Sequence, residues 1–313
     1  MLLSFTAPTP RSDDWFGASL AAVDDVDGDG RTDLAVGAGS ENGENGSSTG
    51  AAYIVSGETG QVLHQLIPPD VPANTRFRWA VAAVPDVNGD GKTDVLVGLA
   101  LATPPGELLY SGRACLFSAA DGKWLRTLAS PTPQTRGFFG WTVAGLPDIT
   151  GDGAGELLIG CAAHGNQGFN TYGERRVYLM NGATGQLIRT LDSPNGGEAF
   201  GLSVTGMLDG NRKLRTIVIG TPHETPPSSP FRSGRVHAFP ICLLGTAPSS
   251  NGFVVTLTSH PDTTHEIQTS SDLQLWTALT NVTATTGTVR ILDTPAGGTN
   301  RRFYRAQSAP SPQ

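Results

Sequence analysis

Cysteine, charged side chains and long apolar runs are all scarce in this chain of 313 residues. The three cysteines are too few for a disulfide framework, and each lies in or beside an apolar stretch, which favours buried thiols: Cys115, Cys161 and Cys242. No apolar run reaches the length of about 18 residues that a membrane-spanning helix needs, so none is expected. The N-terminal residues lack a basic segment and a cleavage site, so no signal peptide is visible.

Charged residues make up 16% of the chain, whereas glycine is abundant, with 40 residues. This balance is typical of short strands and turns rather than of surface helices. The formal net charge is −7, and ten of the 28 acidic residues lie in three short stretches. The acidity is therefore local, and bound divalent cations would nearly cancel it. Because no basic stripe is present, nucleic acid is not an expected partner.

The acidic stretches are three copies of one nine-residue pattern, residues 25–33, 86–94 and 148–156, with a period of about 60 residues. Oxygen-bearing side chains occupy the first, third, fifth and ninth positions, and glycines at the fourth and sixth allow the positive φ angles of a tightly curled loop. Each copy leads into an apolar run that ends in glycine, which indicates a loop before a strand. A fourth copy, 208–216, has lost the acids except for Asp209.

Alternate side chains of such a loop can converge on one point, and hard oxygen ligands suit Ca²⁺. The alternative is a solvated acidic turn. The pattern predicts two structural calcium sites, in the first and second loops, and leaves a third open because Thr150 and Glu156 replace two aspartates. The predicted ligands are Asp25, Asp27, Asp29, Arg31 and Asp33; Asp86, Asn88, Asp90, Lys92 and Asp94; and Asp148, Thr150, Asp152, Ala154 and Glu156, the seventh position of each loop offering its backbone carbonyl.

Period-2 apolar runs and glycine-containing turns around each loop predict four short strands in each of the first three repeats and three in the fourth, which stops after its third strand. The predicted spans are 18–23, 33–37, 50–55 and 61–66; 79–84, 94–98, 112–117 and 124–128; 141–146, 156–160, 175–180 and 187–191; and 202–207, 216–220 and 234–239. Residues 1–7 read as a further strand. A four-stranded sheet cannot bury both faces alone, so neighbouring units must stack. The recurring Phe-Gly pairs predict a close approach between packed sheets.

This constellation resembles the FG-GAP repeat of the integrin α-subunit β-propeller over about residues 12–240. The motif is carried by Phe16-Gly17, Phe139-Gly140 and Phe200-Gly201, each paired with a later glycine at Gly37, Gly160 or Gly220; the second copy departs, with Phe77-Arg78. The resemblance implies an all-β fold, an incomplete or small propeller of four four-stranded blades, with blades near 12–66, 77–128, 139–191 and 200–240 inside a domain at 1–244. Such propellers usually have seven blades, so either the ring closes with four blades or the chain is N-terminally incomplete, and the second alternative is the one expected.

In that family the partner binds the face opposite the calcium loops. Carried over, the resemblance implies an extracellular or cell-surface adhesion module, not an enzyme, whose protein or glycan ligand contacts the second-to-third-strand loops: Glu41 to Thr49, Thr103 to Ser111, His164 to Tyr172 and Thr221 to Ser233. Adjacent connections with Trp15, Arg76 and Arg136 would join them. The alternative is an accessory or catalytic part of a secreted hydrolase or lyase. The pair His223-Glu224 on such a loop is expected to lie at the surface.

A different pattern follows residues 245–252, whose composition predicts a linker. Alternating runs predict strands at 253–258, 265–269 and 288–292. Residues 253–307 resemble a small C-terminal β-sandwich module found on large secreted bacterial proteins, and residues 308–313 are expected to form a disordered tail.

Overall fold

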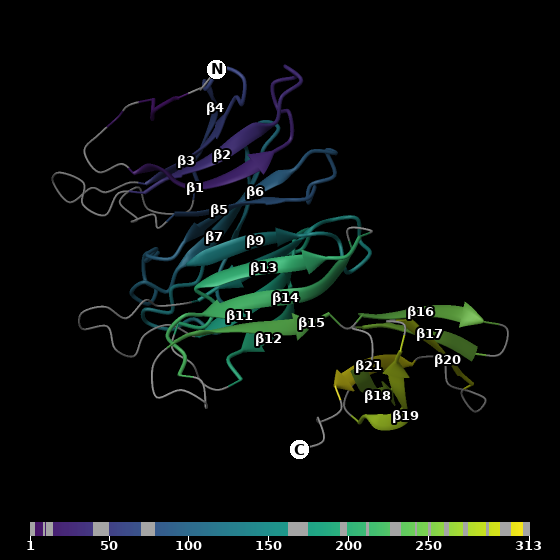
Figure 1. Cartoon of the computed structure of the whole chain (residues 1–313). Coiled ribbons are helices and arrows are strands. Elements are labelled where there is room, and N and C mark those ends of the chain that lie inside the picture. The colour runs from purple at the N-terminus through teal and green to yellow at the C-terminus, as the bar shows by residue number, and fades with distance from the viewer. Residues whose placement is uncertain are drawn as a thin grey trace. The chain divides into compact units, whose positions relative to one another are not determined.

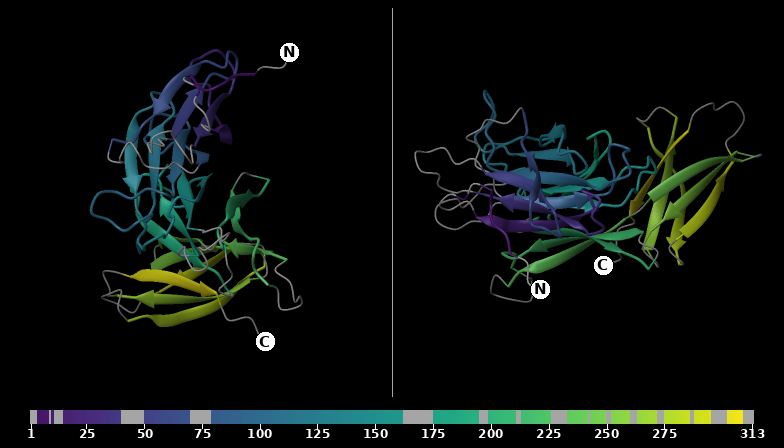
Figure 2. Two further views of the ribbon diagram at one scale, coloured as in Figure 1. Left: turned by 90° about the vertical axis from the view of Figure 1, so that its left-hand side faces the viewer. Right: turned by 90° about the horizontal axis from the view of Figure 1, so that it is seen from above.

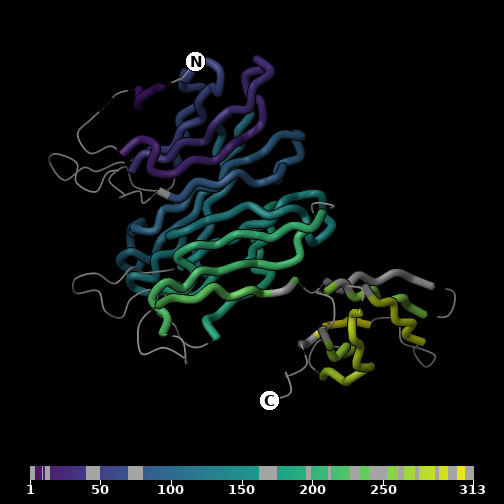
Figure 3. The backbone as a smooth tube through the Cα atoms, viewed as in Figure 1, coloured from purple at the N-terminus to yellow at the C-terminus, as the bar shows by residue number. Residues whose placement is uncertain are grey.

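The structure is a computed structural model that describes residues 4–8, 10, 15–39, 50–69, 79–161, 175–194, 199–210, 213–225, 233–241, 243–249, 252–259, 263–271, 275–285, 288–294 and 302–308. These residues form strands and turns and contain no helix (Figure 3). The predicted all-β class is therefore confirmed.

Three successive four-stranded antiparallel sheets begin the fold (Figure 1), in the orders β1-β2-β3-β4, β5-β6-β7-β8 and β9-β10-β11-β12. Their strands are β1 (Phe16–Val23), β2 (Asp33–Ala38), β3 (Ala51–Val55), β4 (Val62–Leu66), β5 (Trp79–Val84), β6 (Asp94–Leu99), β7 (Arg113–Ser118), β8 (Trp124–Leu128), β9 (Thr142–Leu146), β10 (Glu156–Gly160), β11 (Arg176–Asn181) and β12 (Leu187–Asp192). Each lies within about two residues of its predicted span, because a period-2 apolar pattern bounded by turn residues is a local signal.

A fourth sheet has three strands, β13 (Ser203–Leu208), β14 (Leu214–Thr221) and β15 (Arg235–Pro240). The strand positions again follow the three predicted spans. The first three sheets thus have the four strands predicted for each, and the fourth has the three strands predicted for it, within the residues that the structure describes.

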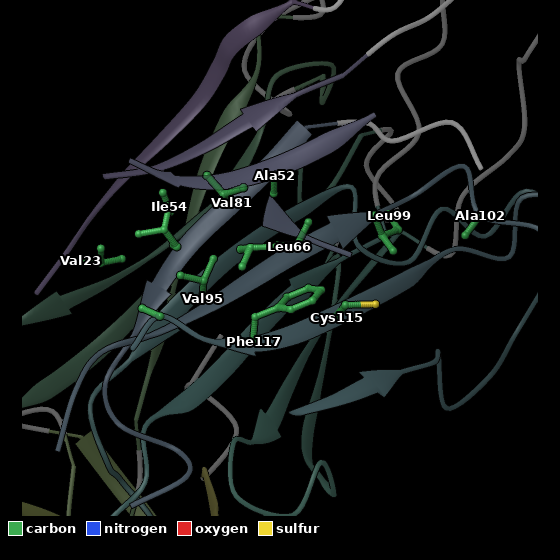
Figure 4. Close-up of a cluster of buried hydrophobic side chains, with 13 residues drawn as sticks. Val23, Ala52, Ile54, Leu66, Val81, Val95, Leu99, Ala102, Cys115 and Phe117 are labelled. Carbon is green, nitrogen blue, oxygen red and sulfur yellow. The ribbon is translucent and has the colours of Figure 1, made fainter. Parts of the chain in front are cut away.

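The hydrophobic core lies between successive sheets. One cluster joins the first and second sheets, with Ile54 and Leu66 from the first and Val95 and Phe117 from the second (Figure 4). A second cluster joins the second and third sheets and includes Leu116, Leu157 and Tyr178. The middle strands β6 and β10 are buried along their whole length. The second sheet therefore buries both faces by stacking on its two neighbours, as the repeat predicts.

Two of the Phe-Gly pairs, Phe139-Gly140 and Phe200-Gly201, lie where neighbouring sheets approach closely, whereas a Cβ at Gly17 of the first pair would meet nothing within 4 Å. Phe139 and Phe200 are fully buried, which is worth about 1.5–3 kcal/mol each. Gly140 has φ +89°, and a Cβ built on Gly98 of the preceding sheet would lie 2.1 Å from the Gly140 carbonyl oxygen. Gly160 and Gly201 repeat this contact, because a Cβ on Gly160 would lie 2.7 Å from the Gly201 carbonyl oxygen. The second copy, Phe77-Arg78, lies outside the described residues.

The segment before the first sheet does not form the predicted strand at 1–7, since residues 4–8 have no ladder partner; residues 1–3 lie outside the description. Instead Phe5 packs edge-on against Phe16, with ring centroids 6.3 Å apart. It joins an apolar cluster with Val36, Tyr53 and Val55. Packing of a half-buried aromatic ring against the first sheet, rather than backbone pairing, joins this segment to the fold.

Two three-stranded sheets follow, β16-β17-β20 and β19-β18-β21, drawn in green to yellow in Figure 2. Their strands are β16 (Leu243–Ser249), β17 (Gly252–Thr258), β18 (Thr263–Ser270), β19 (Thr277–Ala284), β20 (Thr288–Asp293) and β21 (Phe303–Ser308). Side chains of both sheets share one cluster around Val255, Leu257 and Ile267. The prediction of a linker at 245–252 is wrong, because β16 pairs along its length with β17. The small and polar residues of that stretch are typical of a linker, and only pairing with β17, further along the chain, shows that it forms a strand.

The chain divides into two compact units, Met1–Gly206 with Val218–His237, and Met207–Ile217 with Ala238–Gln313. The acidic loops and the first three sheets all belong to the first unit. The predicted domain limits at 244 and 253, and the sandwich module itself, stay predictions.

Candidate metal centres

Each acidic loop joins the first and second strands of its sheet, β1 to β2, β5 to β6, and β9 to β10. The loop glycines adopt the positive φ angles that the pattern predicts, from 80° to 89° in all three copies. A Cβ at these glycines would touch nothing within 4 Å, so backbone conformation rather than space requires them.

The first-position aspartate closes every loop by accepting two backbone N–H groups. Asp25 accepts from Gly28 at 2.7 Å through Oδ1 and from Gly30 at 2.8 Å through Oδ2. The other two copies repeat this geometry at 2.6 to 2.9 Å: Asp86 with Gly89 and Gly91, and Asp148 with Gly151 and Gly153. The sequence pattern therefore encodes one loop conformation three times.

The ninth-position acid is buried behind the loop in all three copies. One oxygen accepts the N–H of the second position, at 2.7 Å for Asp33 and Asp94 and at 2.9 Å for Glu156. The second Asp33 oxygen accepts Gly57 N–H at 2.9 Å, and the second Glu156 oxygen accepts Thr150 N–H at 3.1 Å.

The fifth-position aspartates have partners that sequence reasoning missed. Their Oδ1 atoms accept the N–H of the seventh position, Arg31, Lys92 or Ala154. Their Oδ2 atoms accept from the residue after the third strand or at its end: Ser56 to Asp29 at 3.4 Å, Ser118 to Asp90 at 3.2 Å, and Asn181 to Asp152 at 2.5 Å. The available signal was a polar residue that recurs in every repeat at the start of the hairpin between the third and fourth strands.

The structure brings three acids together in two of the loops. Ligand atoms of Asp25, Asp27 and Asp29 lie within 4.8 Å of one another, and those of Asp148, Asp152 and Glu156 do likewise. In the second loop the third position is Asn88, whose amide donates to Asp90 Oδ2 at 2.9 Å. The third loop, which the sequence left open, thus also gathers three acids, at its first, fifth and ninth positions rather than at the first, third and fifth.

The surroundings move the pKa values of the loop acids in opposite directions. The N–H of Gly30 lowers the pKa of Asp25, and the Asn181 amide lowers that of Asp152. Burial raises the pKa of Asp86, but backbone N–H groups led by Gly91 outweigh it and the net shift is downward. Burial raises the pKa of Glu156.

Asp94 stands apart, because burial raises its pKa to about 7, and the neighbouring Asp90 and Asp86 charges add to the rise. Its side chain is 0% exposed, and its Oδ1 has no hydrogen-bond partner. A buried carboxylate oxygen without a partner is costly unless a cation or donor meets it. The donor chemistry of this loop therefore fits a hard divalent cation, which would supply the missing positive charge.

The opposite ends of the sheets carry the second-to-third-strand loops, since antiparallel strands alternate in direction. Only the 100–112 loop of the second sheet is described in full; Glu41 to Thr49 and His164 to Tyr172 lie outside the described residues, as does much of Thr221 to Ser233. Three backbone bonds tie this loop to residues 136–139, led by Arg136 N–H to the Leu109 carbonyl at 2.6 Å. Tyr110 stacks on Phe138 and is half-buried, whereas Leu108 and Leu109 are each 44% exposed.

The expectation of a surface His223-Glu224 pair is wrong. Glu224 is 3% exposed. One of its carboxylate oxygens lies 2.5 Å from His237 Nε2, and the other lies 3.4 Å from the Arg235 guanidinium. Sequence adjacency misled here, because alternate residues of β15 reach Glu224 from across the sheet.

Within the described part of the chain there is no helix of the length and apolar character that crossing a membrane would take.

Stacked four-stranded sheets with acid-lined first loops define a class of repeat β proteins. The family model for the FG-GAP repeat matches residues 16–55 and 77–103. The chain thus carries FG-GAP repeats, as the Phe-Gly motifs and loop spacing indicate.

The relatives include human integrin alpha-10, 32% identical over 149 residues, and human integrin alpha-IIb, 32% identical over 219 residues. These matches cover 47% and 66% of this chain but only 13% and 20% of the relatives, so the chain corresponds to a fifth or less of their length. The solved Vibrio cholerae biofilm matrix protein Bap1 aligns with 93% of this chain and 61% of its own at 14% identity, with a TM-score of 0.35. A likeness this slight carries no inference about the present chain.

Proposed function

We propose that this chain is a calcium-stabilised recognition module that works outside the cell or at its surface and binds a protein or glycan. The observation that carries the proposal is the threefold repetition of one acid-lined loop, with the same hydrogen bonds at the same end of three stacked sheets. The similarity to integrin α-subunits supports adhesion as the kind of recognition.

The cations would be structural. Asp25, Asp27 and Asp29 would hold one ion, Asp86, Asn88, Asp90 and Asp94 a second, and Asp148, Asp152 and Glu156 a third, with the carbonyls of Arg31, Lys92 and Ala154 completing the sets. Bound Ca²⁺ supplies positive charge that offsets the repulsion among the acids. Extracellular calcium modules have dissociation constants of about 10⁻⁴–10⁻³ M, which supports a location where Ca²⁺ is plentiful.

The role is binding rather than catalysis. The loop acids accept backbone N–H groups and so shape the loops. The buried Glu224, the acid with a histidine partner in the fourth sheet, is already engaged by Arg235 and His237. These contacts favour a scaffold over the hydrolase or lyase alternative.

Recognition would use the end opposite the acidic loops. The 100–112 loop is held by backbone bonds and by the buried Arg113, which pairs with Glu107. On that rigid support Leu108 and Leu109 present adjacent apolar side chains to solvent. Exposed apolar groups on a preorganised loop bind a partner at little entropic cost.

The test is binding of the full chain to a glycan array and to a panel of immobilised extracellular-matrix proteins, with Ca²⁺ and with excess chelator. We expect binding that depends on Ca²⁺ and falls at least about tenfold in the double variant L108S/L109S. The matched control is L187S/I188S, two adjacent apolar residues of β12 with exposures of 44% and 39%. Equal losses in both double variants, or binding unaffected by chelator, would contradict the proposal.

A further inference from the structure

Neighbouring acidic loops are bonded directly to one another. Lys92 Nζ, at the seventh position of the second loop, donates to the Asp25 carbonyl of the first loop at 2.9 Å. Thr93, at the eighth position, donates through both its backbone N–H and its hydroxyl to Asp24 Oδ2, each at 2.7 Å. Three hydrogen bonds thus join residues 24–25 to residues 92–93.

The same connection recurs one sheet further along. Gly155 N–H, at the eighth position of the third loop, donates to the Asp86 carbonyl, at the first position of the second loop, at 3.3 Å. A Cβ on Gly155 would lie 2.8 Å from the Pro85 carbonyl oxygen, so only glycine permits this approach. The first residue of one loop therefore accepts from the seventh or eighth position of the next loop in both cases.

These bonds involve the residues that would hold the ions. Asp25 is the first ligand of the first loop, and Lys92 and Asp94 flank Thr93 in the second. An ion in the second loop would fix residues 92–94 and so present their donors to residues 24–25 in one geometry. Ordering already achieved by one ion need not be repeated for the next, which gives positive cooperativity.

The second loop has its own reason to take an ion first. Asp94 Oδ1 is fully buried and has no hydrogen-bond partner, whereas both oxygens of the corresponding Asp33 accept backbone N–H groups. This unpartnered oxygen therefore lies in the second loop, whose Lys92 and Thr93 donate hydrogen bonds to residues 24–25 beside the first loop.

We propose that cation binding by the first and second loops is positively coupled through Asp24, Lys92 and Thr93, so that an ion in either loop raises the affinity of the other. This inference rests on the proposed function, because it requires that the loops bind cations. Coupling free energies between sites commonly correspond to factors of about 5–150. For three exposed hydrogen bonds we expect a factor near the lower limit, about fivefold.

The experiment follows each loop separately by NMR in the full, ¹⁵N-labelled chain after chelator treatment. The Gly30 and Gly91 amides donate within the first and second loops and report Ca²⁺ binding to each. In D90N, where Asn keeps the shape but loses the charge, the Gly91 response should weaken and the first-loop dissociation constant should rise about fivefold.

The variant D24A/K92M removes the side-chain connections without changing net charge and keeps the Lys92 backbone carbonyl. In this background D90N should change the first-loop dissociation constant less than about twofold. The control is D121A/K123M, a second exposed Asp–Lys pair, in which the fivefold effect should persist. A melt of each variant in chelator identifies any that fail to fold, and K92A then replaces K92M.

The two failures are distinguishable. If the wild-type Gly30 and Gly91 amides do not respond to Ca²⁺ at about 10 mM, well above the extracellular range, the proposed function falls and the coupling with it. If both respond, but the first loop binds equally well with and without D90N, only the coupling is overturned. A fivefold effect that survives in D24A/K92M would also overturn it, since the connection would then run elsewhere.

Discussion

Gly140 lies where two sheets approach closely. The loss of stability on its substitution has two separable causes, steric overlap with the neighbouring sheet and a backbone conformation that favours glycine. A Cβ at Gly140 would lie 2.1 Å from the Arg113 carbonyl oxygen, and φ is +89°. We expect G140A to lower the free energy of unfolding by about 2–5 kcal/mol, since strain and overpacking add. Chemical denaturation in the presence of Ca²⁺ measures it.

Gly106 provides the matched control, because φ is +78° there but a Cβ would meet nothing within 4 Å. G106A should therefore cost only the conformational term, about 1–2 kcal/mol. Similar losses in the two variants would show that sheet-to-sheet contact is not what requires Gly140.

His265 predicts a pH dependence for the C-terminal strands. It is 1% exposed, contacts Ser259 Oγ through Nε2 at 2.6 Å, and burial lowers its pKa. Between the lowered folded pKa and the unfolded value of about 6.5, the unfolded state binds more protons. Stability is therefore complete above about pH 6.5 and declines as the pH falls below it.

The measurement is thermal unfolding between about pH 5 and 8, followed by the fluorescence of Trp276, with W15F/W79F/W124F/W141F removing the other tryptophans. In H265Q the decline between pH 6.5 and 5 should flatten, whatever the absolute stability. An unchanged slope in H265Q would assign the dependence to another group.

At the scale of a single element, Glu224 joins the 221–225 turn after β14 to β15 through its contacts with Arg235 and His237. Glu224 is buried, but the Arg235 side chain that E224Q would leave behind is 31% exposed, so we expect a cost of about 1–3 kcal/mol, the range for a lost hydrogen bond to a charged group. D121N, which breaks the exposed pair with Lys123, should cost less than about 1 kcal/mol. Denaturant unfolding of both variants tests this, and equal costs would show that the contacts of Glu224 stabilise no more than the exposed pair does.

Strand prediction succeeded where the pattern was local. The apolar alternation of β6 and the hairpin glycine Gly185, which has φ +72°, are both visible within a few residues. Strands β16, β19 and β21 were missed because their pairing depends on strands elsewhere in the chain. The Thr-rich and Pro-containing segments look like connections until β17 and β18 supply partners.

For the whole molecule, chelation should lower the melting temperature of the first unit. A ligand at 100 times its dissociation constant stabilises by about 2.7 kcal/mol per site, or about 5–10 °C for a unit of this size. Differential scanning calorimetry with excess Ca²⁺ and with chelator measures the shift. The Ca²⁺-dependent part should shrink in D25N/D86N/D148N. A melt unaffected by chelator would contradict bound cations.

Composition and spacing alone determined the strand positions of the stacked sheets and the three curled loops. These follow from φ preferences of glycine, short-range acceptance of N–H groups by aspartate, and period-2 burial, which act within about ten residues. The fifth-position partners, the Glu224–His237 contact and the bonds from Lys92 and Thr93 to residues 24–25 were decided only by the tertiary structure. Each joins residues whose meeting depends on how strands and sheets stack, which no local pattern encodes.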